Sequence, residues 1–259
     1  MKKWKTTSMT VLPFKYKYDK TEKAFTGYYS FLEKLILDEG AIKICDVGGG
    51  ANPSLSPKFI EKHGLDYTVL DISADELKKA PDVYRKVQAD IGDPNLIIDG
   101  EYYDLVFSRM LAEHVKRGYD FHNNILKMLS PNGVAFHFFP TLFALPFLVN
   151  YLLPERVAYE LINVLQPKIR LKEGNKAKFP AYYSWCFGPL AHQIGRFEKL
   201  GYQVEEYWGF YGHDGYYGRL KLLLKLHQHT SNYLVKHPIP WLTDFAYVIL
   251  RKKAITETC

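Results

Sequence analysis

The sequence predicts an α/β protein built on a doubly wound, mostly parallel sheet of seven strands. Two observations predict this class: short apolar runs of strand length alternate with segments of helical period from residue 21 to residue 139, and polar residues stand directly after most of the apolar runs. Strands that alternate with helices in this way form parallel sheets with right-handed crossovers, and such sheets bind ligands at the carboxyl ends of their strands. The chain has 259 residues, 47% of them hydrophobic, so it can bury one sizeable core.

The first half of the chain contains five of the expected strands. Apolar residues recur at a helical period from Thr21 to Asp38, so a helix is expected before the first strand. That strand covers residues 42–46, ends at Asp46, and is followed by a glycine turn and a helix near residues 53–60. The other expected strands of this half are at 66–70, 83–89, 103–107 and 134–139, with helices at 73–79 and 120–129 between them.

The second half departs from simple alternation. Residues 140–188 form a long, aromatic and proline-rich insertion, with helices expected near 145–153 and 155–165, and we interpret it as a helical lid after strand five. A helix at 189–200, a strand at 202–208, a basic helix at 218–235 and a final strand at 244–250 complete the sheet. The expected organisation is an N-terminal arm and helix (1–40), a cofactor-binding core (41–139), the lid (140–188) and a C-terminal completion of the sheet (189–259).

Composition and charge narrow the function classes. The net charge is +6, but Lys and Arg are spread along the chain, which is more typical of a solvated surface than of a nucleic-acid-binding face. The three cysteines, Cys45, Cys186 and Cys259, lie far apart, which argues against a zinc knuckle or a disulfide framework. This cysteine usage and the absence of a signal-peptide pattern favour a cytoplasmic location. The most apolar stretch, residues 141–153, is shorter than the ~20 residues of a spanning helix and indicates at most weak contact with a membrane or a lipid-linked substrate.

The most informative segment is the turn after the first strand, where Asp46 is followed by Gly48, Gly49 and Gly50. Glycine has no Cβ, so a ligand can lie against the main chain there. A helix that begins behind the turn points its free N–H groups and its positive dipole end at the same place, which suits a carboxylate, a phosphate or a ribose. The residue three positions after Gly50 is Pro53. This disfavours a dinucleotide-binding dehydrogenase, which requires Gly-x-Gly-x-x-Gly opening a helix.

Five segments, taken in order, resemble the class I S-adenosylmethionine-dependent methyltransferases, and within them the type 11 small-molecule enzymes. Residues 46–53, Asp-Val-Gly-Gly-Gly-Ala-Asn-Pro, resemble the first motif of that family, with Asn52 where many members have a third glycine. Residues 70–73, 90–91, 108–114 and 129–133 are similar to its later motifs. The resemblance implies a Rossmann-like fold and S-adenosyl-L-methionine as the cofactor.

The same resemblance implies which residues contact the cofactor. Asp71 is expected to accept hydrogen bonds from the ribose hydroxyls and Ile72 to pack on the adenine, with Asp90 and Ile91 at the adenine edge. The full set of implied cofactor-binding residues is Asp46, Gly48, Gly49, Gly50, Asn52, Asp71, Ile72, Asp90, Ile91, Ser108 and Arg109. No metal ligands are expected.

Two histidines are candidate general bases. His114 follows the end of the fourth strand, although we favour the alternative that Glu113 and His114 anchor the helix and the cofactor loop. His213, beside Asp214, lies in a loop between the last two strands, where it is either a tuned base or part of an exposed turn rich in Gly and Tyr.

Three aromatic residues of the lid, Tyr182, Tyr183 and Trp185, are expected to line the acceptor pocket. They fit equally well a helical cap that covers one face of the sheet. Aromatic faces stack on sugar rings as readily as on apolar acceptors, so the lid does not decide the acceptor class.

The function that we predict is methyl transfer to a hydroxyl of a small molecule, with a saccharide or a glycolipid-like acceptor slightly ahead of other natural products. The Asp/Asn-Pro-Pro-Tyr type of motif found in amino-methylating nucleic-acid enzymes is replaced here by Ser108-Arg109-Met110-Leu111, which disfavours an amine or nucleic-acid acceptor. The alternative from another class is a non-catalytic cofactor-binding or interaction protein, whose basic helix at 219–225 binds an anionic partner. The sequence does not indicate the oligomeric state.

Overall fold

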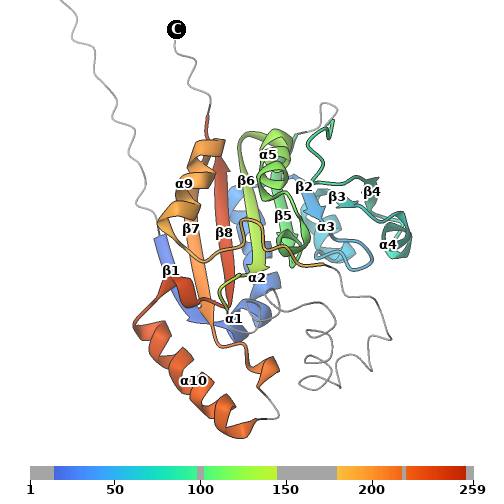
Figure 1. Cartoon of the computed structure of the whole chain (residues 1–259). Coiled ribbons are helices and arrows are strands. Elements are labelled where there is room, and N and C mark those ends of the chain that lie inside the picture. The colour runs from blue at the N-terminus through green and yellow to red at the C-terminus, as the bar shows by residue number, and fades with distance from the viewer. Residues whose placement is uncertain (1–14, 98–101, 145–179, 218–219, 255–259) are drawn as a thin grey trace, which may run out of the picture.

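The computed structural model describes residues 15–97, 102–144, 180–217 and 220–254. Its centre is an eight-stranded sheet with the strand order β1-β7-β8-β6-β5-β2-β3-β4 (Figure 1). Neighbouring strands run parallel, except that β8 is antiparallel to both β6 and β7. The strands are β1 (Lys15–Lys20), β2 (Lys43–Val47), β3 (Asp66–Asp71), β4 (Arg85–Gln88), β5 (Tyr103–Arg109), β6 (Leu129–Pro140), β7 (Tyr202–Tyr211) and β8 (Phe245–Lys252).

The α/β class and the mostly parallel sheet are confirmed, but the expected count of seven strands is one short. The additional strand is β1, which pairs in parallel with β7 at the edge of the sheet. Its sequence, Lys-Tyr-Lys-Tyr-Asp-Lys, has no buried position, so it lacks the apolar run by which the other strands were predicted. An edge strand with alternating charges is also typical of a sheet border that resists further pairing.

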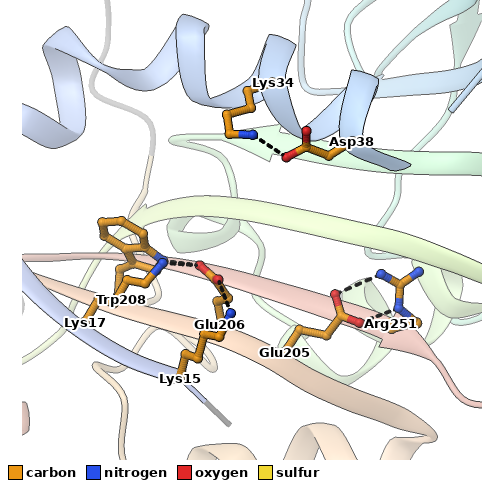
Figure 2. A network of polar contacts seen from close by, with 8 residues as sticks. All are labelled: Lys15, Lys17, Lys34, Asp38, Glu205, Glu206, Trp208 and Arg251. Carbon is orange, nitrogen blue, oxygen red and sulfur yellow. Dashed lines mark hydrogen bonds and ion pairs between the residues drawn. The ribbon is translucent and has the colours of Figure 1, made fainter. Parts of the chain in front are cut away.

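Charged side chains fix the edge strand to its neighbour. The Glu206 carboxylate on β7 accepts hydrogen bonds from Lys17 Nζ at 3.0 Å and from Trp208 Nε1 at 2.8 Å, as part of the network in Figure 2. The Lys17 ammonium lies 4.2 Å from the centroid of the Trp208 ring, within the range of a cation–π contact. These polar contacts hold β1 in place where apolar burial is small.

A second ion-pair network joins the end of β8 to two other elements. Arg251 donates to both carboxylate oxygens of Glu205 on β7, and its Nη2 lies 2.8 Å from Glu39 Oε1 on helix α2 (Tyr28–Glu39). The pairing of Arg251 with Glu205 is visible in Figure 2. Bidentate contacts of this kind are directional, so they help to align the helix with the strand ends.

Helices cover both faces of the sheet. Along β6, Phe136 and His137 point to opposite faces, because successive side chains of a strand alternate. Phe136 stacks with Tyr28 of α2, whereas His137 contacts His122 of α5 (Gly118–Met128) with ring centroids 5.2 Å apart. Helix α9 (Ala191–Leu200) shares the α5 face, because Phe197 contacts the His122 ring. The core therefore consists of the sheet between two helical layers.

Two helix predictions need correction, and two more lie outside the described residues. The segment expected to be one helix from Thr21 to Asp38 is two, α1 (Thr21–Thr26) and α2, separated at Gly27, where a Cβ would lie 2.9 Å from the Lys23 carbonyl oxygen. The helix expected near 53–60 begins later, as α3 (Pro57–His63) with Ser56 as its N-cap. The helices expected at 145–153 and 155–165 lie outside the described residues. Among the described helices, none combines the length and apolar character needed to cross a membrane.

Candidate cofactor site

The glycine turn lies at the carboxyl end of β2 and is packed on two sides. Gly48 and Gly50 have positive φ angles of 79° and 43°, a region that side chains other than glycine rarely adopt. A Cβ at Gly48 would lie 2.8 Å from Leu111 Cδ2, and a Cβ at Gly50 would lie 3.0 Å from Asp71 Oδ2. The neighbouring side chains therefore leave no room for a Cβ at these two positions, which must be glycine. One of these neighbours is Asp71, the predicted ribose-binding carboxylate.

Asp46 lies beneath this turn and supports it. Its Oδ2 accepts hydrogen bonds from the Tyr67 hydroxyl at 2.6 Å and from the Ser54 backbone N–H at 2.8 Å. The side chain is buried, and burial raises the pKa of Asp46 to about 6. A Cβ at Gly49 would lie 2.9 Å from Asp46 Cγ, so the carboxylate is in close contact with the turn. We missed the contribution of Tyr67 from the sequence, because a tyrosine in a buried strand carries no motif signal.

Asp71 ends β3 and stands across from Gly50. Its Oδ1 accepts a hydrogen bond from the Ser73 backbone N–H at 2.8 Å, and its Oδ2 lies on the Gly50 side. The next residue, Ile72, is 63% exposed although it is large and apolar. An exposed isoleucine beside a carboxylate at a strand end is the arrangement that the predicted adenine and ribose contacts require.

Three further predicted residues lie at the rim of this edge. Asp90 is exposed, and its Oδ1 accepts a hydrogen bond from the Gly92 backbone N–H at 2.8 Å. The Ile91 side chain is buried in the core, so it is the main chain of this residue that remains for a cofactor. Asn52 is exposed, and its backbone N–H closes the glycine turn by donating to the Gly49 carbonyl at 2.9 Å.

Ser108 and Arg109, at the end of β5, point in opposite directions. The Ser108 hydroxyl is fully buried and lies 2.8 Å from His137 Nδ1, so its side chain faces the helical layer and not the turn. Arg109 Nη1 donates to the Tyr29 hydroxyl at 2.9 Å, and the guanidinium lies 5.0 Å from the Tyr28 ring centroid. Arg109 Nε is buried without a hydrogen-bond partner among the described residues. Arg109 thus brings a positive charge beside helix α2. We did not predict from the sequence that Tyr28 and Tyr29 contact this arginine.

Glu113 and His114 follow in a short 3-10 helix, η1 (Ala112–His114). Glu113 is 3% exposed, and burial raises the pKa of its carboxyl to about 8, so it carries its proton at neutral pH. His114 Nδ1 lies 2.8 Å from the Pro180 carbonyl oxygen and donates to it, while Nε2 lies 3.6 Å from Glu113 Oε1. When the imidazole is neutral, the lone pair therefore belongs to Nε2, beside a neutral carboxyl group.

The chain returns to this place at residues 180–186. The backbone N–H groups of Tyr182 and Tyr183 both donate to the Glu113 carbonyl oxygen, at 2.7 and 3.1 Å. Tyr182 is 40% exposed, but Tyr183 is buried. The Trp185 ring packs against His122 of α5, with centroids 5.6 Å apart. The structure therefore leaves Tyr182 as the exposed aromatic residue of the three predicted for the lid, because Tyr183 is buried and Trp185 is half-buried against the core.

The second predicted base lies elsewhere. His213 follows β7 and contacts the Phe245 ring at 5.1 Å, and burial lowers the pKa of this histidine to about 4. Asp214, in η2 (Asp214–Tyr216), accepts a hydrogen bond from Gln228 Nε2 at 2.6 Å. Strands β8 and β6 separate β7 from β5, so the ends of β7 and β5 are about 14 Å apart at ~4.8 Å per strand. The structure does not bring His213 and His114 together.

In the part of the chain that the structure describes, the His, Cys, Asp and Glu side chains form no group of three or more that could hold a metal ion.

Together, the fold and this strand-end site define a Rossmann-like enzyme that binds an adenosine-type cofactor. Residues 45–137 match the model of a family described as a methyltransferase domain. This region is a class I S-adenosylmethionine-dependent methyltransferase domain, and S-adenosyl-L-methionine is its cofactor. A comparison of the sequence with curated proteins gave no match.

Solved structures with the same fold are distant in sequence. A Galdieria sulphuraria protein, provisionally titled a sarcosine dimethylglycine methyltransferase, is 13% identical with a TM-score of 0.54, over 90% of this chain and 88% of that one. A Clostridium acetobutylicum S-adenosylmethionine-dependent methyltransferase is 9% identical with a TM-score of 0.52, over 89% and 92% of the two chains. The [4+2]-cyclase SpnF is 13% identical with a TM-score of 0.51, over 86% and 80%. At these identities the likeness shows the fold alone, and the fold hosts more than one chemistry.

Proposed function

We propose that the protein transfers the methyl group of S-adenosyl-L-methionine to a hydroxyl of a small-molecule acceptor, with a saccharide or glycolipid-like compound ahead of other natural products. The observation that carries the proposal is the His114 imidazole after the end of β5, which is hydrogen-bonded to the Pro180 carbonyl and has its Nε2 3.6 Å from Glu113 Oε1. An alcohol must lose its proton as it attacks, whereas a carboxylate or a neutral amine has less need of a base. A histidine fixed beside the cofactor edge therefore favours an alcohol acceptor.

The residues present fit the cofactor. Asp71 has the carboxylate to accept the ribose hydroxyl protons, and the exposed Ile72 offers an apolar surface to the adenine. The main chain of Gly48 and Gly49 is partly exposed and carries no side chain, so the amino-acid end of the cofactor can lie against it. Arg109, whose buried Nε has no partner among the described residues, is our candidate to bind the cofactor carboxylate. Asp46 acts from beneath, by holding the turn through Ser54 and Tyr67.

The proton balance follows from the state of two side chains. When bound, the cofactor would supply a sulfonium methyl group to the acceptor oxygen and would leave as S-adenosylhomocysteine. His114 Nε2 would accept the proton that the acceptor hydroxyl loses. Before reaction, the Glu113 carboxyl beside Nε2 is neutral. After reaction, Nε2 carries the proton taken from the acceptor and releases it to solvent, because the His114 side chain is 36% exposed whereas Glu113 is buried.

The acceptor class rests on Tyr182. Its exposed ring stands on the segment that is bound to Glu113, next to the proposed base. Aromatic rings stack on the apolar faces of sugars and also on apolar natural products. Tyr182 therefore supports a ring-shaped acceptor and leaves the choice among such acceptors to experiment.

A second candidate function is cofactor binding without methyl transfer. The similarity in fold to the [4+2]-cyclase SpnF supports it, because that protein is named for a reaction other than methyl transfer. The two functions differ in one product, since only methyl transfer releases S-adenosylhomocysteine.

The test is an acceptor screen with the purified protein saturated in S-adenosyl-L-methionine. Sugars, phenols and amines are offered separately, and release of S-adenosylhomocysteine is measured. We expect release with hydroxyl acceptors and a loss of release in the His114→Ala variant. Reaction with amines alone would overturn the hydroxyl assignment, and cofactor binding without any release would favour the second candidate.

A further inference from the structure

Helix α10 (Lys221–Lys236) presents large apolar side chains to the outside of the molecule. Leu222 is 80% exposed, Leu226 is 61% exposed and Tyr233 is 57% exposed. Positions 222, 226 and 233 share one side of a helix, because they differ by four and seven residues. We name this row, together with Lys221, Lys225 and Lys236, the α10 outer face.

The opposite side of α10 explains why the helix is held in place. Ser231 and Leu234 are buried, and Leu224 and His227 are half-buried, so a narrow stripe at helical spacing packs inward. This stripe faces β1 and β7, the two strands that α10 contacts most. In Figure 1, α10 extends along the outside of the molecule, beyond this edge of the sheet. No described residue covers the outer face, so its apolar row is not required to build the core.

The charge of α10 limits what can cover this face. The helix contains three lysines and no acidic residue. Lys221, Lys225 and Lys236 form a second row beside the apolar one, since they differ by four and eleven residues. The nearby Asp214 carboxylate binds Gln228 Nε2 and lies 3.9 Å from His227 Nε2, and it forms no ion pair with these lysines. Among the described residues, no carboxylate pairs with the lysine row. A second copy docked symmetrically on the same face would place lysines near lysines.

We infer that the α10 outer face docks on an anionic lipid surface. The leucine and tyrosine side chains, which lie along one side of the helix, enter the boundary between the lipid headgroups and the acyl chains. The lysine side chains beside them extend to the lipid phosphates. From Leu222 to Tyr233 the apolar row is about 16 Å long at 1.5 Å per residue, so the helix lies flat on the surface. A nucleic acid would satisfy the lysines but would leave the exposed leucines without apolar contact.

The inference is independent of methyl transfer, because it concerns a helix that carries none of the proposed cofactor residues. It places the protein at a membrane surface by adsorption and not by insertion, which agrees with the described helices being unable to span a bilayer. Lipid-linked acceptors would be concentrated at such a surface, whereas water-soluble ones would not.

The test is sedimentation of the full chain with vesicles of phosphatidylcholine alone or of phosphatidylcholine mixed with phosphatidylglycerol. We expect binding to the mixed vesicles, weaker binding at high salt and little binding to the neutral ones. Leu222→Ser with Leu226→Ser should weaken binding about tenfold or more, and so should Lys221→Glu with Lys225→Glu.

Matched controls separate this surface from general stickiness. Leu37→Ser removes an exposed leucine on α2, and Lys58→Glu with Lys62→Glu removes two exposed lysines on α3; neither should change binding. Equal binding to both vesicle types, no binding to either, or binding unaffected by the α10 variants would overturn the inference. It would also be overturned by a dimer in sedimentation equilibrium that the leucine variant dissociates, or by RNA binding that only the lysine variant removes.

Discussion

The two halves of the sheet each carry a buried aspartate at the strand ends, and the two carboxylates differ in what they support. Asp46 accepts hydrogen bonds from Ser54 N–H and the Tyr67 hydroxyl, beneath the glycine turn. Asp244 accepts hydrogen bonds from the backbone N–H groups of Gly212 and His213, at 2.6 and 3.2 Å. Burial raises the pKa of both carboxyls to about 6. Similar burial and a similarly raised pKa therefore accompany two different roles.

The difference lies in the neighbouring residues. Around Asp46 the next strand end offers an exposed isoleucine and the Asp71 carboxylate, so polar groups and apolar surface remain available to a ligand. Around Asp244 the tyrosine and histidine side chains complete their contacts within the protein, as Tyr211 does with Ile239 and His213 with Phe245. A perturbed pKa indicates burial in both places, but a binding site only where such groups remain open.

The largest expected effect is at Asp71, in the half of the sheet where polar groups remain available to a ligand. Asp71→Ala removes the proposed acceptor for two ribose hydroxyls, and hydrogen bonds to a charged group contribute about 1.5–3 kcal/mol each. We therefore expect the Kd for S-adenosylhomocysteine, measured by calorimetry, to rise roughly 10²–10⁴-fold. The control is Asp75→Ala, an exposed carboxylate on α4 (Ala74–Lys79) whose only described ion pair is with Lys78. Similar losses in the two variants would contradict the assignment of Asp71.

The two buried aspartates provide the second test. Asp46→Ala and Asp244→Ala each leave two donors without an acceptor, so each should lower the free energy of unfolding by about 2–4 kcal/mol in urea denaturation. At a temperature where both variants remain folded, only Asp46→Ala should lose affinity for the cofactor. If Asp244→Ala lost as much affinity, the separation of the two halves would be wrong.

The sequence was sufficient to predict the strand ends in the half of the sheet that carries the motifs, which contains β2 and β3. The ends of β2 and β3 were predicted within a residue or two, because apolar runs there stop at Asp46 and Asp71. The contacts that support the site were not predictable, since Tyr67 and Pro180 reach it from distant positions in the chain. The contact between Tyr29 and Arg109 spans 80 positions and leaves no local pattern.

The half of the sheet that contains β1, β7 and β8, and the segment that follows residue 180, were predicted less well for a physical reason. The strand β1 is too polar and exposed to be recognised by periodicity, and it became visible only through its pairing with β7. Aromatic residues suggested a pocket lining, but Tyr183 and Trp185 are used for packing. Aromatic side chains stabilise cores and bind ligands by the same apolar contacts, so composition alone does not separate the two uses.

The two candidate bases provide the third test. His114→Ala should lower kcat about 10²-fold, the usual contribution of a positioned general base, with a smaller change in KM. His213→Ala should leave kcat unchanged, because His213 lies about three strand spacings away from β5. Initial rates of S-adenosylhomocysteine release measure both, with circular dichroism to confirm that each variant is folded. A larger loss in the His213 variant would reverse the assignment.

The last expected effect varies with pH and concerns Glu113, whose pKa of about 8 lies far above the ordinary value of 4.5. A carboxyl with a raised pKa stabilises the fold fully below its unfolded pKa, and the contribution is lost as the pH rises from there through the folded value. Glu113→Gln cannot ionise, so its stability relative to the unsubstituted protein should increase from about pH 5 to about pH 8, by up to about 1.4 kcal/mol per pH unit.

Urea denaturation of both proteins across this range measures that difference. The other titrating groups, including Asp46, Asp244 and the buried pair His122 and His137, are present in both proteins and cancel. A difference that does not vary with pH would mean that Glu113 is ionised in the folded protein. His114 Nε2 would then lie beside a carboxylate and not beside a neutral carboxyl group, and the proposed state of this pair before the reaction would be wrong.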